Sequence, residues 1–224
     1  MYRIWGLIAI FLIVAGCKTA KMPGSQFSSK GFSWDNATVY FMLTDRFYNG
    51  DKSNDFQHPK DAQPAPLRGY MGGDVKGITQ KIKEGYFDSL GVDVLWMTPL
   101  VENIEGSVDE GTGRSYGFHG YWTKDWTAID KRVGTPSEVA EMVKTAHAHG
   151  IRVIMDAVIN HTGPVTPMDV KWPEEWVKTG PRCVYKDYAS TVNCTLVDNL
   201  PDVRTESTSE VNLPPSLVEK WKKE

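Results

Sequence analysis

The feature that most constrains the fold is an alternation of short apolar runs with helix-like stretches between residues 38 and 156. The apolar runs predict β-strands at residues 38–43 (TVYFML), 92–97 (VDVLWM) and 151–156 (IRVIMD). Strands that alternate with helices form parallel sheets covered by those helices. The pattern therefore predicts an α/β fold, and both a doubly wound sheet and a (β/α)₈ barrel would satisfy it. Long polar loops after the strands, and the lack of a GxGxxG motif after the first strand, favour the barrel.

Two helices are predicted between these strands. The first carries apolar residues at four-residue intervals and ends at Gly91. Its apolar residues are Ile78, Ile82, Tyr86 and Leu90. A capping box of Thr135 and Glu138, with Pro136 at the first helical position, predicts the start of the second helix, and Gly150 predicts its end. The buried stripe of the second helix is expected to consist of Val139, Met142, Val143 and Ala146.

The amino-terminal residues predict export. A short positively charged segment precedes an apolar run from Ile4 to Ala15. This run is shorter than a typical transmembrane helix and resembles the apolar part of a secretory signal peptide. The run ends in VAGC, which resembles a bacterial lipobox with Cys17 as the lipidated residue. The alternative is an ordinary signal peptide with a chance cysteine. We therefore expect a lipoprotein signal peptide at 1–17, a flexible tether at 18–30, and an extracytoplasmic, membrane-anchored protein in the periplasm or on the cell surface.

Charge and cysteine content set two further expectations. The formal net charge of −3 gives no indication of a nucleic-acid partner. Beyond Cys17 the chain contains two cysteines, Cys183 and Cys194. An exported protein encounters oxidising conditions, under which these two cysteines could form a disulfide. A disulfide between them is expected, and two free buried thiols are the alternative.

The first motif that suggests chemistry is NGDKSND at residues 49–55, followed by GGD at 72–74. Calcium takes six to eight oxygen ligands and accepts carbonyl oxygens, and such a run of Asn and Asp around glycines can converge on one cation. The same residue types also favour turn-rich, solvated loops that bind no metal. The residues alone leave both interpretations open.

Two more motifs lie on the loops that follow the second and third predicted strands. Residues 116–122 (YGFHGYW) offer aromatic faces for a sugar ring, with His119 and Tyr121 able to form hydrogen bonds to its hydroxyls. The alternative is a hydrophobic plug within a long loop. Residues 156–161 (DAVINH) place Asp156, Asn160 and His161 where a barrel carries its active site, or where a strand end carries ordinary capping residues.

Taken together, these segments resemble a known family. TDRFYNGD, GGDVKGI, LGVDVLWMTP, YGFHGYW and DAVINH occur in the order of the opening of the α-amylase family of glycoside hydrolases. The similarity is greatest to cyclodextrin glucanotransferases and to the cyclomaltodextrinase–neopullulanase group. It extends from about Thr38 to His161, with a weaker similarity at residues 200–202. The resemblance implies the first three strands of a (β/α)₈ TIM barrel at 31–161, an inserted calcium-associated domain at 162–214, and the start of the next barrel helix at 215–224.

The resemblance also implies roles for individual residues. One calcium ion would be bound near the amino terminus by Asn49, Asp51, Asn54, Asp55, Asp74 and the carbonyl of Gly72. A second would lie between the barrel and the inserted domain, bound by Asn160 and Asp202. Tyr121 would stack on the sugar before the cleaved bond, with Trp122 beside it and His161 hydrogen-bonded to that sugar. Asp156 would be a supporting carboxylate that orients an arginine of the active site.

The catalytic carboxylates themselves are expected outside this chain. Family members cleave α-1,4-glucans with retention of configuration, using carboxylates that follow the fourth, fifth and seventh strands. The 224 residues contain three predicted strands, so they hold no expected catalytic residue, and this stretch alone is predicted to be inactive. The alternative is a non-catalytic starch- or maltooligosaccharide-binding lipoprotein remnant. This alternative is unfavourable on physical grounds, because three βα units cannot close a barrel and would leave an open sheet edge.

Overall fold

The computed structural model describes residues 32–204, except residues 170, 175, 193 and 198. The predicted signal peptide with Cys17, the tether at 18–30 and the helix expected from residue 215 lie outside the described residues. Among the residues that are described, no helix has the length and apolar character needed to cross a bilayer.

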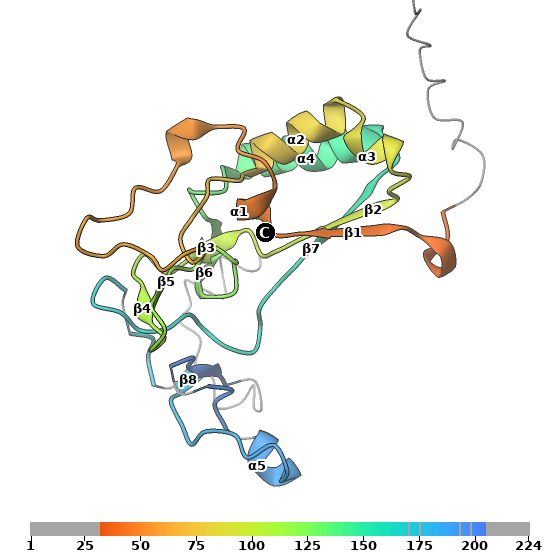
Figure 1. The fold of residues 1–224 in the computed structure, drawn as a ribbon. Coiled ribbons are helices and arrows are strands. Elements are labelled where there is room, and N and C mark those ends of the chain that lie inside the picture. Colours follow the sequence, from red (N-terminus) through yellow and green to blue (C-terminus); the bar gives the residue numbers. More distant parts are fainter. Residues whose placement is uncertain (1–31, 170, 175, 193, 198, 205–224) are drawn as a thin grey trace, which may run out of the picture. The chain divides into compact units, whose positions relative to one another are not determined.

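The fold is built around a parallel sheet of three strands in the order β1–β2–β7 (Figure 1). These strands are β1 (Val39–Met42), β2 (Val94–Met97) and β7 (Arg152–Met155). Phe41 on β1 pairs with Trp96 on β2, and Trp96 pairs with Ile154 on β7. All three strands lie within the predicted runs, so the predicted parallel α/β arrangement is confirmed.

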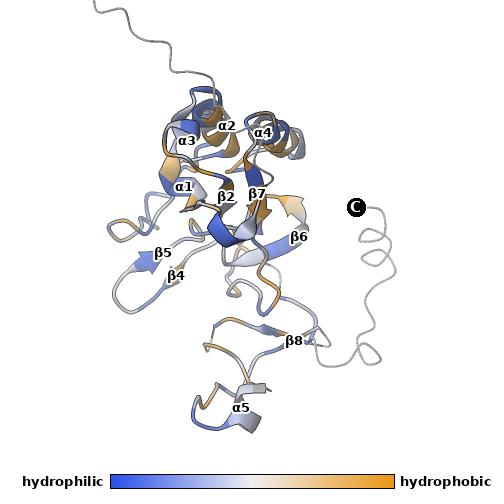
Figure 2. Cartoon of the chain, turned by 90° about the vertical axis from the view of Figure 1, so that its right-hand side faces the viewer, coloured by the Kyte–Doolittle hydropathy of each residue, from blue (hydrophilic) through white to orange (hydrophobic). Residues whose placement is uncertain are grey.

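Helices cover one face of this sheet. They are α2 (Val75–Lys83), α3 (Tyr86–Ser89) and α4 (Pro136–Ala148). Leu95 and Met97 of β2 are fully buried in one core cluster with Ile78 and Ile82 of α2 and Met142 of α4. Figure 2 shows hydrophilic and hydrophobic residues side by side on these helices, as expected for elements with one solvated face. The predicted capping box of α4 is confirmed, with Pro136 in its first turn.

The prediction of one helix ending at Gly91 is wrong. Gly85 has φ +74°, a left-handed conformation that ends α2 and reorients the chain before the single turn of α3. The four-residue spacing therefore does not continue: Tyr86 and Leu90 are exposed, and Phe87 is buried in their place.

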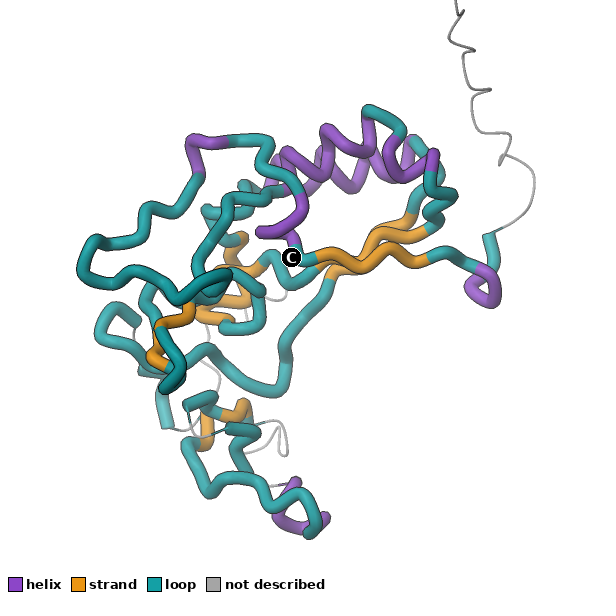
Figure 3. The backbone as a smooth tube through the Cα atoms, in the orientation of Figure 1, coloured by secondary structure: helices purple, strands orange, loops and turns teal. Residues whose placement is uncertain are grey.

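The other elements are short and separated by long loops (Figure 3). They are η1 (Trp34–Asn36), α1 (Thr44–Phe47), η2 (Lys52–Asn54), β3 (Val101–Asn103), β4 (Val108–Asp109), β5 (Arg114–Ser115), β6 (Thr123–Ile129), β8 (Val177–Lys178), α5 (Tyr188–Val192) and β9 (Asp202–Val203). Three antiparallel pairs form among them: β3 with β6, β4 with β5, and β8 with β9. A disulfide joins Cys183 to Cys194.

The two faces of the parallel sheet differ in how well they are covered. The face toward the helices carries Leu95 and Met97, both fully buried. The opposite face carries Phe41, which is 45% exposed, and Trp96, which is 39% exposed, with their rings 5.0 Å apart. The described residues thus form an open sheet rather than a closed barrel.

Candidate functional site

A polar cluster forms at the carboxyl ends of β2 and β7. The hydroxyl of Tyr121 donates to Oδ2 of Asp156 at 2.9 Å, and Nε1 of Trp96 donates to the same oxygen at 3.3 Å. Burial raises the pKa of Tyr121 to about 12, and the hydrogen bond to Asp156 adds to the shift, so the phenol keeps its proton. The structure thus brings the predicted residues Tyr121 and Asp156 together. It adds Trp96, which the sequence analysis did not assign to the site.

His161 contacts the backbone of Tyr121. Its Nε2 is 3.3 Å from the carbonyl oxygen of Tyr121. Its Nδ1 is buried and has no hydrogen-bond partner among the described residues. Burial lowers the pKa of His161, which favours the neutral ring. His161 therefore retains one buried ring nitrogen without a partner among the described residues, beside the tyrosine.

His119 supports the backbone of Tyr121. Its Nδ1 accepts a hydrogen bond from the amide nitrogen of Tyr121 at 3.0 Å, and the two rings stack with centroids 5.9 Å apart. Burial lowers the pKa of His119 to about 4; Glu110 opposes this shift, and the nearby Arg46 adds to it. The ring is therefore neutral at pH 7, and because Nδ1 accepts, its proton lies on Nε2. The structure places His119 in a supporting position behind Tyr121.

Trp122, which the resemblance places beside Tyr121 among the substrate-binding residues, is largely buried. Its side chain is 7% exposed and packs with Ile104 and Leu200 in a second core cluster. Its amide nitrogen donates to Oδ1 of Asn103 at 2.8 Å. Trp122 therefore anchors the 116–122 loop in the core.

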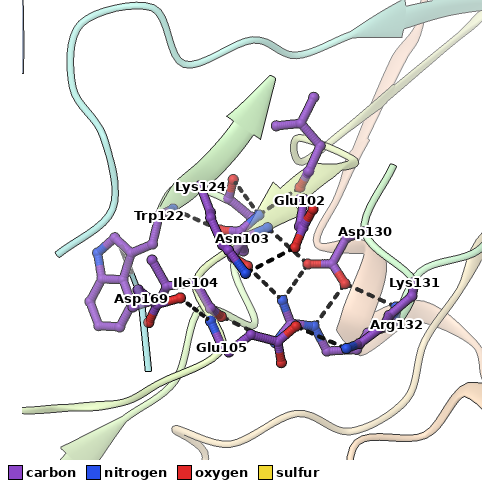
Figure 4. A network of polar contacts seen from close by, with 12 residues as sticks. Glu102, Asn103, Ile104, Glu105, Trp122, Lys124, Asp130, Lys131, Arg132 and Asp169 are labelled. Atoms are coloured by element: carbon purple, nitrogen blue, oxygen red, sulfur yellow. Dashed lines mark hydrogen bonds and ion pairs between the residues drawn. The ribbon is translucent and has the colours of Figure 1, made fainter. Parts of the chain in front are cut away.

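A buried network, which the sequence analysis did not predict, lies beneath this loop (Figure 4). Arg132 is 4% exposed, and its Nε donates to Oδ1 of Asp130 at 2.7 Å. Its two terminal nitrogens donate to the carbonyl oxygens of Asn103, at 2.9 Å, and Ile104, at 3.1 Å. A buried charge needs such a complete set of partners. Asp130 and Arg132 lie two positions apart directly after β6, and this spacing alone does not reveal that they are buried.

The predicted calcium loop has unpaired acceptors. Oδ1 of Asn49 and Oδ1 of Asn54 are buried and have no hydrogen-bond partner among the described residues. Nδ2 of Asn49 donates to Oδ1 of Asp55 at 2.7 Å. Gly72 lies against these side chains at φ +86°, and a Cβ there would come within 2.4 Å of both Asn49 Nδ2 and Asp55 Oδ1. Orphaned amide oxygens beside a carboxylate fit the ligand chemistry of calcium.

The other two predicted ligands of this loop already have protein partners. Oδ2 of Asp51 forms an ion pair with Lys76, which lowers the pKa of Asp51. Asp74 caps α2: its Oδ1 accepts from Gly77 N at 2.6 Å, and its Oδ2 accepts from Gly50 N at 3.1 Å. Across the described part of the chain, no group of three or more His, Cys, Asp or Glu side chains is arranged to hold a metal. A cation here would depend on the amide and carbonyl oxygens together with the carboxylate of Asp55.

Asn160 and Asp202, the predicted ligands of the second calcium, are brought together by the backbone. The carbonyl of Asn160 accepts a hydrogen bond from Val203 N at 2.8 Å, and His161 forms an antiparallel bridge with Asp202. Oδ2 of Asp202 also lies 3.4 Å from Nζ of Lys178. Residues 42 positions apart in the numbering therefore meet beside His161.

Comparisons with known proteins agree with this arrangement. Residues 41–223 match the family model for the alpha-amylase catalytic domain. A periplasmic alpha-amylase from Escherichia coli (strain K12) is 44% identical over 149 residues, which cover 64% of this chain and 22% of that protein. A cyclomaltodextrin glucanotransferase from Bacillus licheniformis is 33% identical over 174 residues, which cover 73% of this chain and 24% of that protein.

The crystal structure of an alpha-amylase from Geobacillus thermoleovorans, complexed with acarbose, superimposes with a TM-score of 0.62 and 30% identity. The match covers 80% of this chain and 36% of that one. The chain thus spans less than a quarter of the length of these curated relatives. The sheet of β1, β2 and β7 with its helices is a fragment of an amylase TIM barrel.

Proposed function

The chain belongs to the α-amylase family, as part of its catalytic domain, and on this basis we propose that the whole protein hydrolyses α-1,4-glucosidic bonds in starch or maltooligosaccharides. The reaction would retain the anomeric configuration, with a carboxylate nucleophile and a carboxylic acid/base. Those carboxylates are expected after the fourth, fifth and seventh strands of the barrel. Hydrolysis is proposed in preference to transglycosylation.

The observation that carries the proposal is the cluster of Tyr121, Asp156 and Trp96. It lies at the carboxyl end of a parallel sheet, where barrels of this architecture place their active sites. Tyr121 supplies an aromatic face held in one orientation by its hydrogen bond to Asp156. His161, beside it, supplies a neutral ring with an unpartnered nitrogen. Such a site can stack on one sugar ring and bind its hydroxyls.

The non-catalytic alternative receives no support from the sheet. Phe41 and Trp96 leave apolar area exposed on the face opposite the helices. A free-standing binding protein would have to tolerate this exposed face, which is an aggregation hazard. The same face is the natural interior of a barrel.

We further propose that calcium binds in the 49–55 loop. The unpaired oxygens of Asn49 and Asn54, with Asp55 and the carbonyl of Gly72, support this proposal. A second calcium beside Asn160 and Asp202 is supported by their proximity. When bound, calcium would supply fixed positive charge that holds these loop segments together. The chain's own residues would orient the sugar.

The proposed location is the periplasm or the cell surface, with a lipid anchor at Cys17. The VAGC sequence supports the anchor. The name of the Escherichia coli relative, a periplasmic alpha-amylase, supports an extracytoplasmic site.

The proposal can be tested by assaying the longer protein on maltooligosaccharides, with Tyr121→Ala as the site variant. Loss of the ring is expected to lower kcat/KM roughly a hundredfold, because a sugar placed imprecisely reaches the transition state rarely. Tyr188→Ala is the matched control, since that tyrosine is 84% exposed on α5. An active wild-type protein with unchanged kinetics for Tyr121→Ala would remove Tyr121 from the site. Absence of hydrolysis by the wild type would overturn the function itself.

A further inference from the structure

We propose that Asn103 is a positioning residue for Tyr121, an inference that rests on the proposed function of this site. Asn103 is the last residue of β3 and is 2% exposed. Its side chain spans the backbone on both sides of Tyr121. Oδ1 accepts a hydrogen bond from Trp122 N at 2.8 Å, and Nδ2 donates to the carbonyl of Gly120 at 3.2 Å. One amide group thus fixes the peptide before Tyr121 and the peptide after it.

Asn103 is itself fixed by the ion pair beneath it. Its amide nitrogen donates to Oδ2 of Asp130 at 3.0 Å, and its carbonyl oxygen accepts from a terminal nitrogen of Arg132 at 2.9 Å. Figure 4 shows Asn103 between this pair and Trp122. Because Asp130 and Arg132 are both buried, they hold Asn103 in a nearly fixed position. Asn103 in turn holds the backbone of the 116–122 loop in place.

The hydrogen bonds require an asparagine at this position. The side chain must accept from the amide of Trp122 while it donates to the carbonyl of Gly120 and, at 2.9 Å, to the carbonyl of Val101. An amide of this length does both at the same time. Aspartate would keep the acceptor but would place a second oxygen against the carbonyl of Gly120. The loop has little other freedom to compensate. Gly120 has φ +85°, and a Cβ there would lie 2.6 Å from the carbonyl oxygen of Pro99.

The predicted consequence is a displaced ring. Tyr121 reaches Asp156 through its hydroxyl, so its ring is held at the tip by Asp156 and at the backbone by Asn103. Without the hydrogen bonds from Asn103 to the backbone, only the bond between the Tyr121 hydroxyl and Asp156 would orient the ring. The sugar would then stack on a ring in several orientations, and the effect would appear in kcat/KM through Tyr121.

The test is a double-mutant cycle in the longer protein with Asn103→Asp, Tyr121→Ala and the double variant. Asn103→Asp is expected to lower kcat/KM for a maltooligosaccharide about tenfold, as the loss of a buried hydrogen bond predicts. In the Tyr121→Ala background the same substitution should have almost no further effect, because the two residues act as one unit. A purely structural role for Asn103 would give the same factor in both backgrounds and would overturn the inference.

Two further variants keep the test decisive. Thr145→Val removes a buried hydroxyl that donates to Glu141 O on α4, remote from the loop, and should lower the melting temperature without changing kcat/KM. Asn103→Ser replaces Asn103→Asp in the cycle if the aspartate variant does not fold. If the wild type shows no hydrolysis, both the function and the inference fail. If the wild type is active and the two effects multiply independently, only the inference fails.

Discussion

The 49–55 loop and the 116–122 loop are both rich in polar residues and glycine, but their polar groups are satisfied in opposite ways. In the first, Asn49 and Asn54 hold buried oxygens without a partner among the described residues. In the second, the backbone of Tyr121 is bonded on both sides, with its amide to His119 and its carbonyl near His161. The chain completes the second loop itself and leaves acceptors for a ligand in the first.

This difference has a consequence for binding. A loop that is ordered before its ligand arrives loses little conformational freedom on binding, so the 116–122 loop is suited to orient a sugar. A loop with unsatisfied buried oxygens is stabilised when a cation arrives, so the 49–55 loop is suited to a structural metal. The following predictions test whether the two loops differ in this way.

The largest expected effect is that of calcium on stability. Calcium at roughly a thousand times its Kd should raise the free energy of unfolding of the longer protein by about 4 kcal/mol. Chelation should reverse the gain, as measured by thermal unfolding with and without EGTA. Asn54→Ala sharpens the test. Without calcium it removes an orphaned oxygen and should be neutral or slightly stabilising, whereas with calcium it should be destabilising.

Asn36→Ala is the control for this reversal, because Asn36 is exposed on η1. It should have the same small effect in both conditions. If chelation leaves the melting temperature of the wild type unchanged, the metal assignment is wrong and the two loops do not differ as described.

A smaller effect is expected from acid through His119. Its pKa is about 4 in the folded protein, against an ordinary value of 6.5. Between these values the unfolded chain binds a proton that the folded protein resists, so stability falls as the pH decreases from 6.5 toward 4. The loss from this group should approach about 3 kcal/mol near pH 4. Urea unfolding at several pH values would measure it.

His119→Asn should flatten this pH dependence, since an amide oxygen can accept the hydrogen bond of Tyr121 N without titrating. His147→Asn, at an exposed position on α4, should leave the wild-type curve unchanged. A His119→Asn protein with the full wild-type slope would show that the 116–122 loop does not depend on a neutral ring.

The smallest effect is expected for Lys76→Met. The Lys76 side chain is half exposed and pairs with Asp51 and Glu138, so its loss should change the melting temperature little. It would, however, free the carboxylate of Asp51, and calcium titration should show a severalfold increase in affinity. Lys83→Met, whose partner Glu141 lies away from the loop, should leave the affinity unchanged. A decrease in affinity for Lys76→Met would contradict a ligand role for Asp51.

Sequence reasoning located the strands because buried parallel strands are apolar along almost their whole length, as at residues 94–97. It also identified the start of α4, since a capping box is a local signal. It failed at Gly85, because a four-residue spacing does not reveal a left-handed residue that interrupts the helix.

At the site, Tyr121, Asp156 and His161 could be proposed from an ordered set of motifs. Asn103 and Arg132 could not. Their roles depend on hydrogen bonds to backbone atoms of residues 17 to 29 positions away in the sequence, which come within bonding distance only in the folded chain. The burial of Trp122 could not be predicted for the same reason, because the core cluster that holds it includes Leu200.

The uncovered sheet face bearing Phe41 and Trp96 also bears on how such a protein is made. Synthesis proceeds from the amino terminus, so β1, β2 and β7 emerge together with their helices well before the later parts of a barrel. Throughout that interval the nascent chain displays an apolar surface that only subsequent strands can bury. Chaperone engagement and the rate of chain elongation, as much as the final stability, would then determine the yield of native protein.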